Sequence, residues 1–196
     1  MKEGIKMENY SKVAVVTAAT RGIGWAIAEN LAEKNVHVYI ASIPQELEDA
    51  AEKIKEANEK YSGRIDTLVY DAHDINSYEP MFKKFFETED KIDILVNNYG
   101  TSNRQIDLDI EHIKYDDFSR FVDINYASVM LPIQLCLENM KKNGGGSIIN
   151  IGSIAATVPD MTMMAYGVAK AGICQITKMA ALQLAEYGIR CNAVLP

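Results

Sequence analysis

Short runs rich in β-branched residues alternate with longer helical patterns along the whole chain. This alternation is typical of a parallel sheet with helices on both of its faces. We therefore predict an α/β fold, a doubly wound parallel sheet in three layers, α/β/α. The six expected strands are Lys12 to Thr17, Val36 to Ala41, Arg64 to Tyr70, Ile92 to Asn97, Gly146 to Ile151 and Ile189 to Val194.

The helical patterns between these strands differ in character. Gly22 to Lys34 places Ile23, Ile27 and Leu31 at four-residue spacing, which predicts the buried face of a helix. Gln45 to Tyr61 is a more polar helical stretch. Tyr115 to Lys142 is long and apolar on most sides, so we expect it to be buried or half covered by a partner subunit, in a homodimer or homotetramer.

Chain length bounds the number of domains. A chain of 196 residues with 48% hydrophobic content is long enough for one domain with a substantial core, and we predict a single domain over residues 1–196. The sixth expected strand ends at Val194, without the covering helix that an open parallel sheet requires. We expect a domain that is incomplete at its C-terminus and lacks a last strand and a substrate lid.

Charge and composition exclude several classes of function. The formal charge of −7 and the absence of a basic tract argue against nucleic acid as a partner. Residues 1–8 lack the apolar run of a signal peptide, and no segment approaches the roughly 18 apolar residues of a membrane span. Three widely spaced cysteines favour reduced thiols over disulfides or a zinc site. We expect a cytoplasmic protein without a metal.

The first expected strand runs directly into a glycine turn, Thr17 to Gly24. Backbone N–H groups at the start of the following helix face outward there and favour an anion. Gly22 and Gly24 let the backbone approach a pyrophosphate closely. A turn of this kind also occurs without a ligand, but its position after the first strand favours a dinucleotide.

The end of the second strand predicts which dinucleotide binds. A carboxylate there would bind the 2′-hydroxyl of NAD and repel the 2′-phosphate of NADP. The chain instead reads Ile40-Ala41-Ser42-Ile43, and Arg21 in the glycine turn supplies a cation. This favours NADP(H) over NAD(H), although Arg21 is also a residue type found on any solvated surface.

Ser153, Tyr166 and Lys170 follow the pattern Ser-x12-Tyr-x3-Lys. Tyr166 and Lys170 share one helix face, so the lysine cation can favour ionisation of the phenol. That pair alone is common on solvated helix faces. Ser153, however, follows the strand Gly146 to Ile151 at the sheet edge where open α/β folds bind ligands. Together the three residues predict redox chemistry on an alcohol or ketone.

The motifs occur in an order that resembles the short-chain dehydrogenase/reductase family, whose fold is of Rossmann type. The matching segments are the glycine turn, Asn97-Asn98-Tyr99-Gly100, Asn125, Ser153, Tyr166 with Lys170, and Asn192 to Pro196. The resemblance implies that Tyr166 is the general acid or base and that Ser153 holds the substrate oxygen. It also implies that Lys170 binds the nicotinamide ribose and that Asn125 interrupts its helix to hold a proton-relay water.

The same resemblance implies the contacts to the cofactor. They are Thr17, Arg21, Ile23 and Gly24 in the turn, Ser42 after the second strand, Asp71 with Ala72 at the adenine, Asn98 near the ribose, and Tyr166 and Lys170. Asp71 has an alternative role as the cap of a helix that begins near Ile75. Asn97 has an alternative role in linking neighbouring strands without touching a ligand.

Two residues depart from the family pattern. Ala18 replaces the usual first glycine, which the turn accepts if the φ angle of Ala18 is negative. Tyr99 replaces the usual alanine of Asn-Asn-Ala-Gly. Its ring is expected near the nicotinamide, where it would narrow or line the substrate pocket.

Within the family, Asn-Asn-Tyr-Gly, Val158-Pro159-Asp160 and Ile189 to Pro196 resemble bacterial 7α-hydroxysteroid dehydrogenases that act on bile acids. A bile acid or other steroid suits a largely apolar cleft. A reductase of 3-oxoacyl thioesters or another secondary alcohol dehydrogenase would share every catalytic residue. A cofactor-binding protein without turnover is the alternative from another class.

Overall fold

Six strands form one parallel sheet in the computed structural model, which describes residues 10–196. They are β1 (Lys12–Thr17), β2 (Val36–Ser42), β3 (Arg64–Val69), β4 (Ile94–Asn97), β5 (Gly146–Ile151) and β6 (Ile189–Val194), in the order β3-β2-β1-β4-β5-β6. All six predicted strands are confirmed. The N-terminal stretch that argued against a signal peptide lies outside the described residues.

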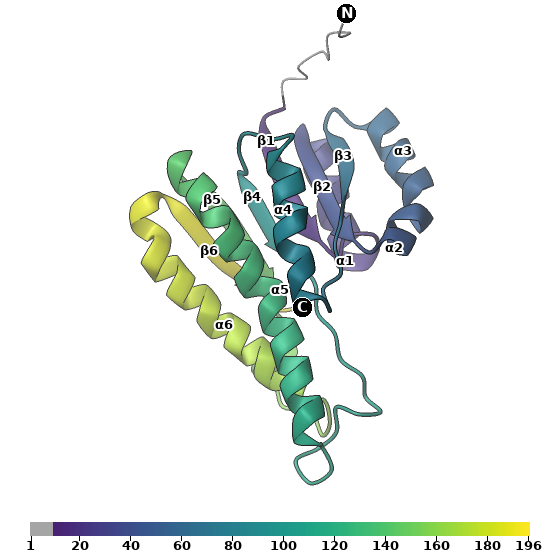
Figure 1. Ribbon diagram of the computed structural model, residues 1–196, viewed down its shortest axis with the longest axis vertical. Helices are drawn as coiled ribbons and strands as arrows, with labels where there is room; N and C mark the ends of the chain where they lie inside the picture. Colours follow the sequence, from purple (N-terminus) through teal and green to yellow (C-terminus); the bar gives the residue numbers. More distant parts are fainter. Residues whose placement is uncertain (1–9) are drawn as a thin grey trace, which may run out of the picture.

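Helices cover both faces of the sheet (Figure 1). They are α1 (Gly22–Glu33), α2 (Pro44–Asp49), α3 (Ala51–Lys60), α4 (Tyr78–Phe86), α5 (Tyr115–Lys142) and α6 (Met164–Leu184), with short 3₁₀ turns η1 (Ile75–Ser77), η2 (Ile154–Ala156) and η3 (Ala185–Tyr187). The predicted helix from Gln45 to Tyr61 is in fact two helices, which meet at Ala50. The predicted bounds of α5 are confirmed.

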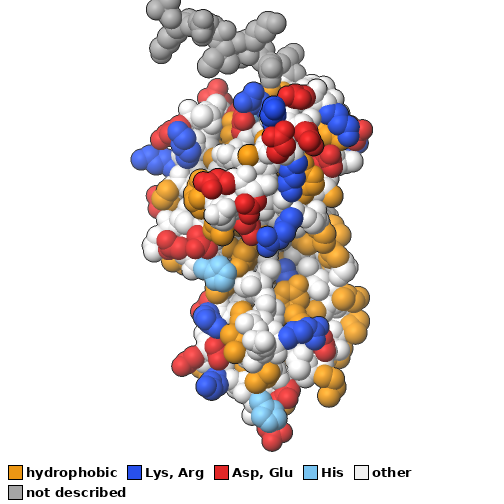
Figure 2. All heavy atoms as spheres, turned by 90° about the vertical axis from the view of Figure 1, so that its right-hand side faces the viewer, with side chains coloured by type: hydrophobic (Ala, Val, Ile, Leu, Met, Phe, Trp, Pro, Cys, Tyr) orange, Lys and Arg blue, Asp and Glu red, His pale blue; other side chains and the backbone are white. Residues whose placement is uncertain are grey.

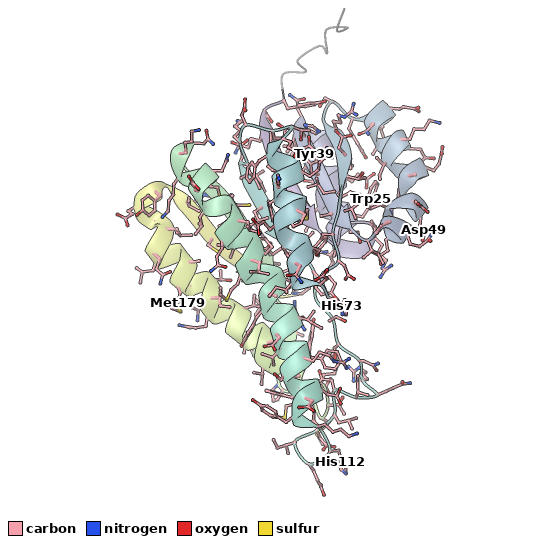
Figure 3. All side chains as sticks on the ribbon, viewed as in Figure 1. Trp25, Tyr39, Asp49, His73, His112 and Met179 are labelled. Atoms are coloured by element: carbon pink, nitrogen blue, oxygen red, sulfur yellow. The ribbon has the colours of Figure 1, made fainter. Side chains whose placement is uncertain are left out.

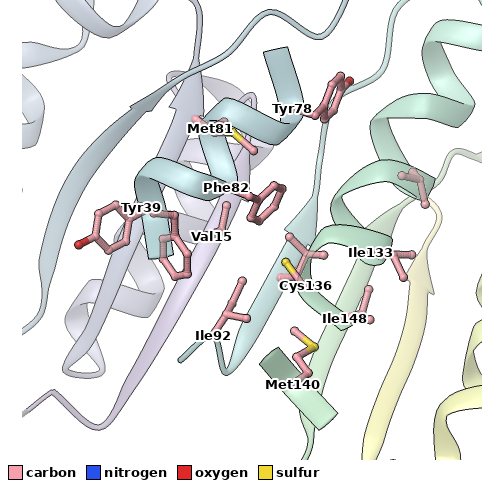
Figure 4. Close-up of a cluster of buried hydrophobic side chains, with 14 of the residues drawn as sticks. Val15, Tyr39, Tyr78, Met81, Phe82, Ile92, Ile133, Cys136, Met140 and Ile148 are labelled. Carbon is pink, nitrogen blue, oxygen red and sulfur yellow. The ribbon is translucent and has the colours of Figure 1, made fainter. Parts of the chain in front are cut away.

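Alternation along β1 sends neighbouring side chains to opposite faces and so produces two cores. Val13 and Val15 face α4, α5 and α6, whereas Ala14 and Val16 face α1. Figure 4 shows the first core, where Phe82 of α4 lies near Val15 of β1 and Cys136 of α5 near Ile148 of β5. Burying a side chain of this size contributes roughly 1.5–3 kcal/mol, which fixes the sheet as a rigid platform for its loops.

The buried face of α1 differs from the predicted one. Gly24, Ala28 and Ala32 are its buried residues, and Ile23 is 49% exposed. Small side chains let the helix axis approach the sheet closely, so the row of small residues packs inward instead of the apolar row. Ile27 and Leu31 turn toward β4 and β5 and line, with other residues, a groove of about 470 Å³ over the sheet face that no described helix covers.

The surface carries mixed charge and some exposed apolar residues. Figure 2 shows acidic and basic side chains interspersed over the upper part of the face that it views. Met130 of α5 and Val168, Met179 and Leu182 of α6 are exposed, and the predicted pairing of subunits stays a prediction.

Across residues 10–196, no helix combines the length and apolar character needed to cross a bilayer. Cys136 and Cys191 are buried, Cys174 is half-buried, and all three are free.

Candidate functional site

A cavity of about 710 Å³ opens where the strands on both sides of β1 end. This is the point at which the chain reverses its direction across the sheet, where open α/β folds bind ligands. Six predicted cofactor contacts line the cavity: Arg21, Ile23, Ser42, Asp71, Ala72 and Asn98. Four segments that are separate in the sequence, at the ends of β1, β2, β3 and β4, therefore form one wall.

Thr17 and Gly24, the other two contacts predicted in the turn, are buried and do not line the cavity, and their contact with a cofactor stays a prediction. Thr17 is fully buried, and its hydroxyl accepts the N–H of Asn98 at 3.0 Å. Asn98 in turn donates from its side-chain amide to the carbonyl oxygen of Ala18 at 2.9 Å. Thr17 and Asn98 therefore join the glycine turn to the loop after β4.

Gly24 allows the glycine turn to fold tightly. A Cβ on Gly24 would lie 2.6 Å from the Asn98 amide nitrogen and 2.7 Å from the Ala18 carbonyl oxygen, so any side chain would force the turn open. Only hydrogen fits there. The tight turn, the start of α1 and the cavity volume together fit a nicotinamide dinucleotide.

Ala18 itself has a φ angle of +49°, so the condition of a negative φ, under which the turn accepts a methyl group without strain, is not met. Its N–H donates to the carbonyl oxygen of Ala41 at 2.7 Å, while its own carbonyl accepts the Asn98 amide. Hydrogen bonds on both sides hold the residue in the left-handed region that normally favours glycine. The turn thus accepts the methyl group under strain.

Two acidic residues, Glu46 and Asp71, follow the second and third strands and line the cavity. Glu46 in α2 forms an ion pair with Arg21, at 2.9 Å between Oε1 and Nη1. Asp71 accepts the N–H of His73 at 2.9 Å, whereas Asp74 caps η1. The alternative role of Asp71 as a helix cap is therefore wrong. Glu46 was not singled out from the sequence.

Tyr99 lies against His73 in this first cavity. The Tyr99 hydroxyl is 2.7 Å from Nε2 of His73, and the two rings meet edge to face. Figure 3 places His73 close to the beginning of α4. Tyr99 therefore lines the cavity on the side of Asp71 and Ala72, and its expected place in a substrate pocket stays a prediction.

Lys170 is the most deeply buried cation of the site, at 2% exposure. Its Nζ donates to the carbonyl oxygen of Ile151 at 2.9 Å and lies 5.5 Å from the centre of the Tyr166 ring. Burial disfavours the charged ammonium and lowers the pKa of Lys170 to about 8. The predicted pairing of Tyr166 and Lys170 on one helix face is present in α6.

Asn125 of α5 holds the loop that follows β4. Its side-chain amide donates to the carbonyl oxygens of Thr101 at 2.9 Å and Phe121 at 2.7 Å, and its Oδ1 accepts the N–H of Thr101 at 3.1 Å. A Cβ on Gly100 would lie 2.7 Å from Lys170 Nζ and 3.5 Å from Asn125 Oδ1, so the two polar groups meet at that glycine. The implied interruption of the helix at Asn125 is not found, because α5 is continuous there.

A second cavity of about 570 Å³ adjoins Tyr166. Its wall is largely apolar and includes Met161, Met163, Met164 and Ala155. Ser153 precedes Ala155 by two residues, and its hydroxyl accepts the Ala155 N–H at 3.2 Å. Ser153 therefore belongs to the turn that forms one side of this cavity, close to the start of α6.

Asp107, in the loop between β4 and α5, holds the start of α6. It is fully buried, and its carboxylate accepts the N–H of Ala165 at 2.8 Å and that of Tyr166 at 3.0 Å. The residue before the helix, Met163, provides no side-chain cap and has a φ angle of +61°. A carboxylate remote in sequence thus replaces the local cap and fixes the backbone of Tyr166.

The sequence patterns did not identify Glu46, His73 and Asp107. The three residues differ in whether a sequence pattern could have revealed them. Glu46 follows Ser42 by four residues, so a search for charge beyond the strand end would have found it. His73 and Asp107 stand in irregular loops, and their partners Tyr99 and Tyr166 are far away in the chain. No local pattern predicts such pairs.

Comparison with known proteins agrees with this geometry. The sequence model of the short chain dehydrogenase family matches residues 12–196. The chain is 45% identical to 7α-hydroxysteroid dehydrogenase of Clostridium sardiniense, over 94% of this chain and 70% of that protein. It is 42% identical to 7α-hydroxysteroid dehydrogenase of Paraclostridium sordellii, over 97% and 70% of the two chains.

A solved structure supports the same assignment. L-sorbose reductase from Gluconobacter frateurii, complexed with NADPH and L-sorbose, superposes with a TM-score of 0.86 and 26% identity, over 95% of this chain and 69% of that one. The family model spans nearly all the described residues, and the relatives match along the same length. The chain belongs to the short chain dehydrogenase family.

Proposed function

We propose that this oxidoreductase transfers a hydride between NADP(H) and a secondary alcohol or ketone, with the 7α-hydroxyl of a bile acid as its substrate. One observation carries the proposal: the buried Lys170 cation lies 5.5 Å from the Tyr166 ring centre and meets Gly100, which lines the dinucleotide cavity, while Tyr166 lines the second cavity. Lys170 and Tyr166 thus connect the site expected to hold the hydride carrier with the site expected to hold the substrate.

Arg21, Ser42 and Asn98 would hold a nicotinamide dinucleotide in the first cavity, where it would supply or accept a hydride. Tyr166 donates a proton to the carbonyl oxygen during reduction and takes it back during oxidation. Lys170 stabilises the phenolate that remains, because its ammonium is fixed by Ile151 in surroundings poor in water. Ser153 donates a hydrogen bond to the substrate oxygen as charge develops there.

The second cavity supports a steroid over a small polar substrate. Its methionines offer a flexible apolar wall, and polar side chains such as Asp109, Thr157 and Thr162 stand between them, which suits a rigid ring system with isolated hydroxyls. The 7α-hydroxysteroid dehydrogenases of Clostridium sardiniense and Paraclostridium sordellii, both relatives of this chain, point to the same substrate class. A 3-oxoacyl thioester reductase is the runner-up, because it needs the same three catalytic residues.

NADP(H) is the proposed cofactor because Arg21 lines the dinucleotide cavity and no carboxylate occurs from Ile40 to Ile43. The NADPH complex of the sorbose reductase supports the same choice. A protein that binds the cofactor without turnover is the alternative from another class, and the intact set of Ser153, Tyr166 and Lys170 argues against it.

The test follows NADPH absorbance with cholate and chenodeoxycholate, beside a 3-oxoacyl thioester and a short secondary alcohol. We expect turnover with the bile acids and, in Tyr166→Phe, a kcat lower by about 10²–10⁴-fold with an unchanged Kd for NADPH. Turnover only with the thioester would transfer the assignment to the runner-up. Full turnover in Tyr166→Phe would reject Tyr166 as the proton donor.

A further inference from the structure

Glu46 occupies a place in the dinucleotide cavity that an anion of the cofactor would need. We propose that Glu46 determines cofactor specificity by competing with the 2′-phosphate of NADP for Arg21, Ser42 and Thr20. The inference rests on the proposed function, because it assumes that a dinucleotide binds in the first cavity. It concerns the cavity wall alone and involves no catalytic residue.

Three donors of the wall converge on this one carboxylate. Oε1 of Glu46 pairs with Arg21 at 2.9 Å, while Oε2 accepts the hydroxyl of Thr20 at 3.1 Å and that of Ser42. Arg21 is the cation that the sequence predicts for a 2′-phosphate, Ser42 is a predicted cofactor contact, and Thr20 lines the same cavity. In the structure they already bind an internal anion.

Burial and charge make this arrangement selective. The Glu46 side chain is only 26% exposed, and the hydrogen bond from Ser42 lowers the pKa of its carboxyl, so it stays ionised at neutral pH. Arg21 is 79% exposed and can turn toward either anion. A phosphate and a carboxylate only accept hydrogen bonds and repel each other, so both cannot share these donors.

The two cofactors therefore meet different conditions. NADP must displace Glu46 from Arg21 and Ser42 before its 2′-phosphate can bind, and the lost bonds reduce its affinity. NAD leaves the carboxylate in place, because a 2′-hydroxyl can donate to it. Glu46 consequently narrows the preference for NADP that Arg21 would otherwise create.

The experiment measures the Kd of NADP+ and of NAD+ by isothermal titration calorimetry, without substrate. In Glu46→Gln we expect NADP+ to bind about tenfold more tightly, a change of about 1.4 kcal/mol, while NAD+ binds equally or more weakly. Glu48→Gln is the matched control: it makes the same change of charge on an exposed residue of the same helix, and both Kd values should stay within about twofold. The Arg21→Ala/Glu46→Gln double variant should lose the gain.

The outcomes separate this inference from the proposed function. Equal changes for both cofactors in Glu46→Gln, or weaker binding of NADP+, would overturn the competition, because Glu46 would then support the turn or orient Arg21 for the phosphate. A gain that persists without Arg21 would overturn it as well. A wild-type protein that binds neither dinucleotide would reject the proposed function together with the inference.

Discussion

Ala18 shows how one residue can be held against its own preference. The left-handed backbone costs a residue with a Cβ roughly 1–2 kcal/mol, yet Ala18 adopts a φ angle of +49°. Hydrogen bonds to Ala41 and from Asn98 fix its peptide groups from two neighbouring loops. The dinucleotide turn therefore draws on the surrounding sheet for its shape.

We expect Ala18→Gly to raise the free energy of unfolding by about 1 kcal/mol, because relief of the strain exceeds the extra chain entropy of glycine. Urea denaturation measures the effect. Asn35→Gly is the comparison, since Asn35 has a φ angle of +60° but asparagine tolerates it, so its gain should be smaller. A loss of stability in Ala18→Gly would contradict strain at this residue.

Helix α6 begins without a local cap, and its first turn depends on another segment. The Asp107 carboxylate accepts the N–H groups of Ala165 and Tyr166, and the Asp107 carbonyl accepts that of Met163 at 2.8 Å. The loop after β4 therefore sets the direction in which α6 leaves the sheet edge. Asp107 acts as a positioning residue for Tyr166.

Asp107→Ala should lower kcat about tenfold or more, because the first turn of α6 loses both acceptors, while the Kd for NADPH changes by less than about twofold. Asp107→Asn keeps one acceptor oxygen and should fall between wild type and Asp107→Ala. Asp116→Ala, at an exposed site on α5, is the control. Parallel losses of kcat and NADPH affinity would indicate a general structural role instead.

A helix can be predicted from the sequence when its pattern of apolar residues matches the way it packs. The bounds of α5 were predictable because a continuous apolar pattern runs from Tyr115 to Lys142. The buried face of α1 was not, since Ile23 has the stronger hydrophobic signal and yet Gly24 packs inward. Close approach to a sheet favours small side chains, and a pattern of hydrophobicity does not record it.

At the scale of the whole molecule, a polar cluster links β2, β3 and the segment after α4. His37 lies 2.9 Å from Asp66 and 2.8 Å from Glu89, and the Tyr39 hydroxyl donates to Glu89 at 2.9 Å. Burial raises the pKa of Asp66, but hydrogen bonds from His37 and Arg64 outweigh it and lower that pKa to about 2. Ionised Asp66 therefore stabilises the folded chain.

This linkage predicts a loss of stability in acid. The pKa of Asp66 rises to its ordinary 3.8 on unfolding, so the contribution is present above about pH 4 and is lost as the pH falls toward 2. We expect Asp66→Asn to remove about 1–2 kcal/mol at pH 6 and much less at pH 2. Urea denaturation at both pH values measures it, with exposed Asp123→Asn as the control. An equal loss at both values would contradict the linkage.

The proposed catalytic set could be named from the sequence because Ser153, Tyr166 and Lys170 stand at fixed short spacings, and its catalytic role stays a prediction. The cofactor wall was predictable in outline, since strand ends in a parallel sheet share one edge. The ion pair between Arg21 and Glu46 was not predictable, because it depends on the direction that α2 takes after β2. Contacts between separate loops are decided by packing that only the assembled sheet provides.

The position of β1 between β2 and β4 governs when this protein becomes able to bind its cofactor during synthesis. The ribosome releases the glycine turn early, and β2 and β3 can pair beside it. The hydroxyl of Thr17, however, lacks its partner Asn98 until that residue is made later. Asn98 also completes the wall of the cavity opposite the glycine turn. We therefore expect β1 of the nascent chain to keep one edge unpaired until β4 has been made, and a dinucleotide to stabilise the chain only after β4 has docked.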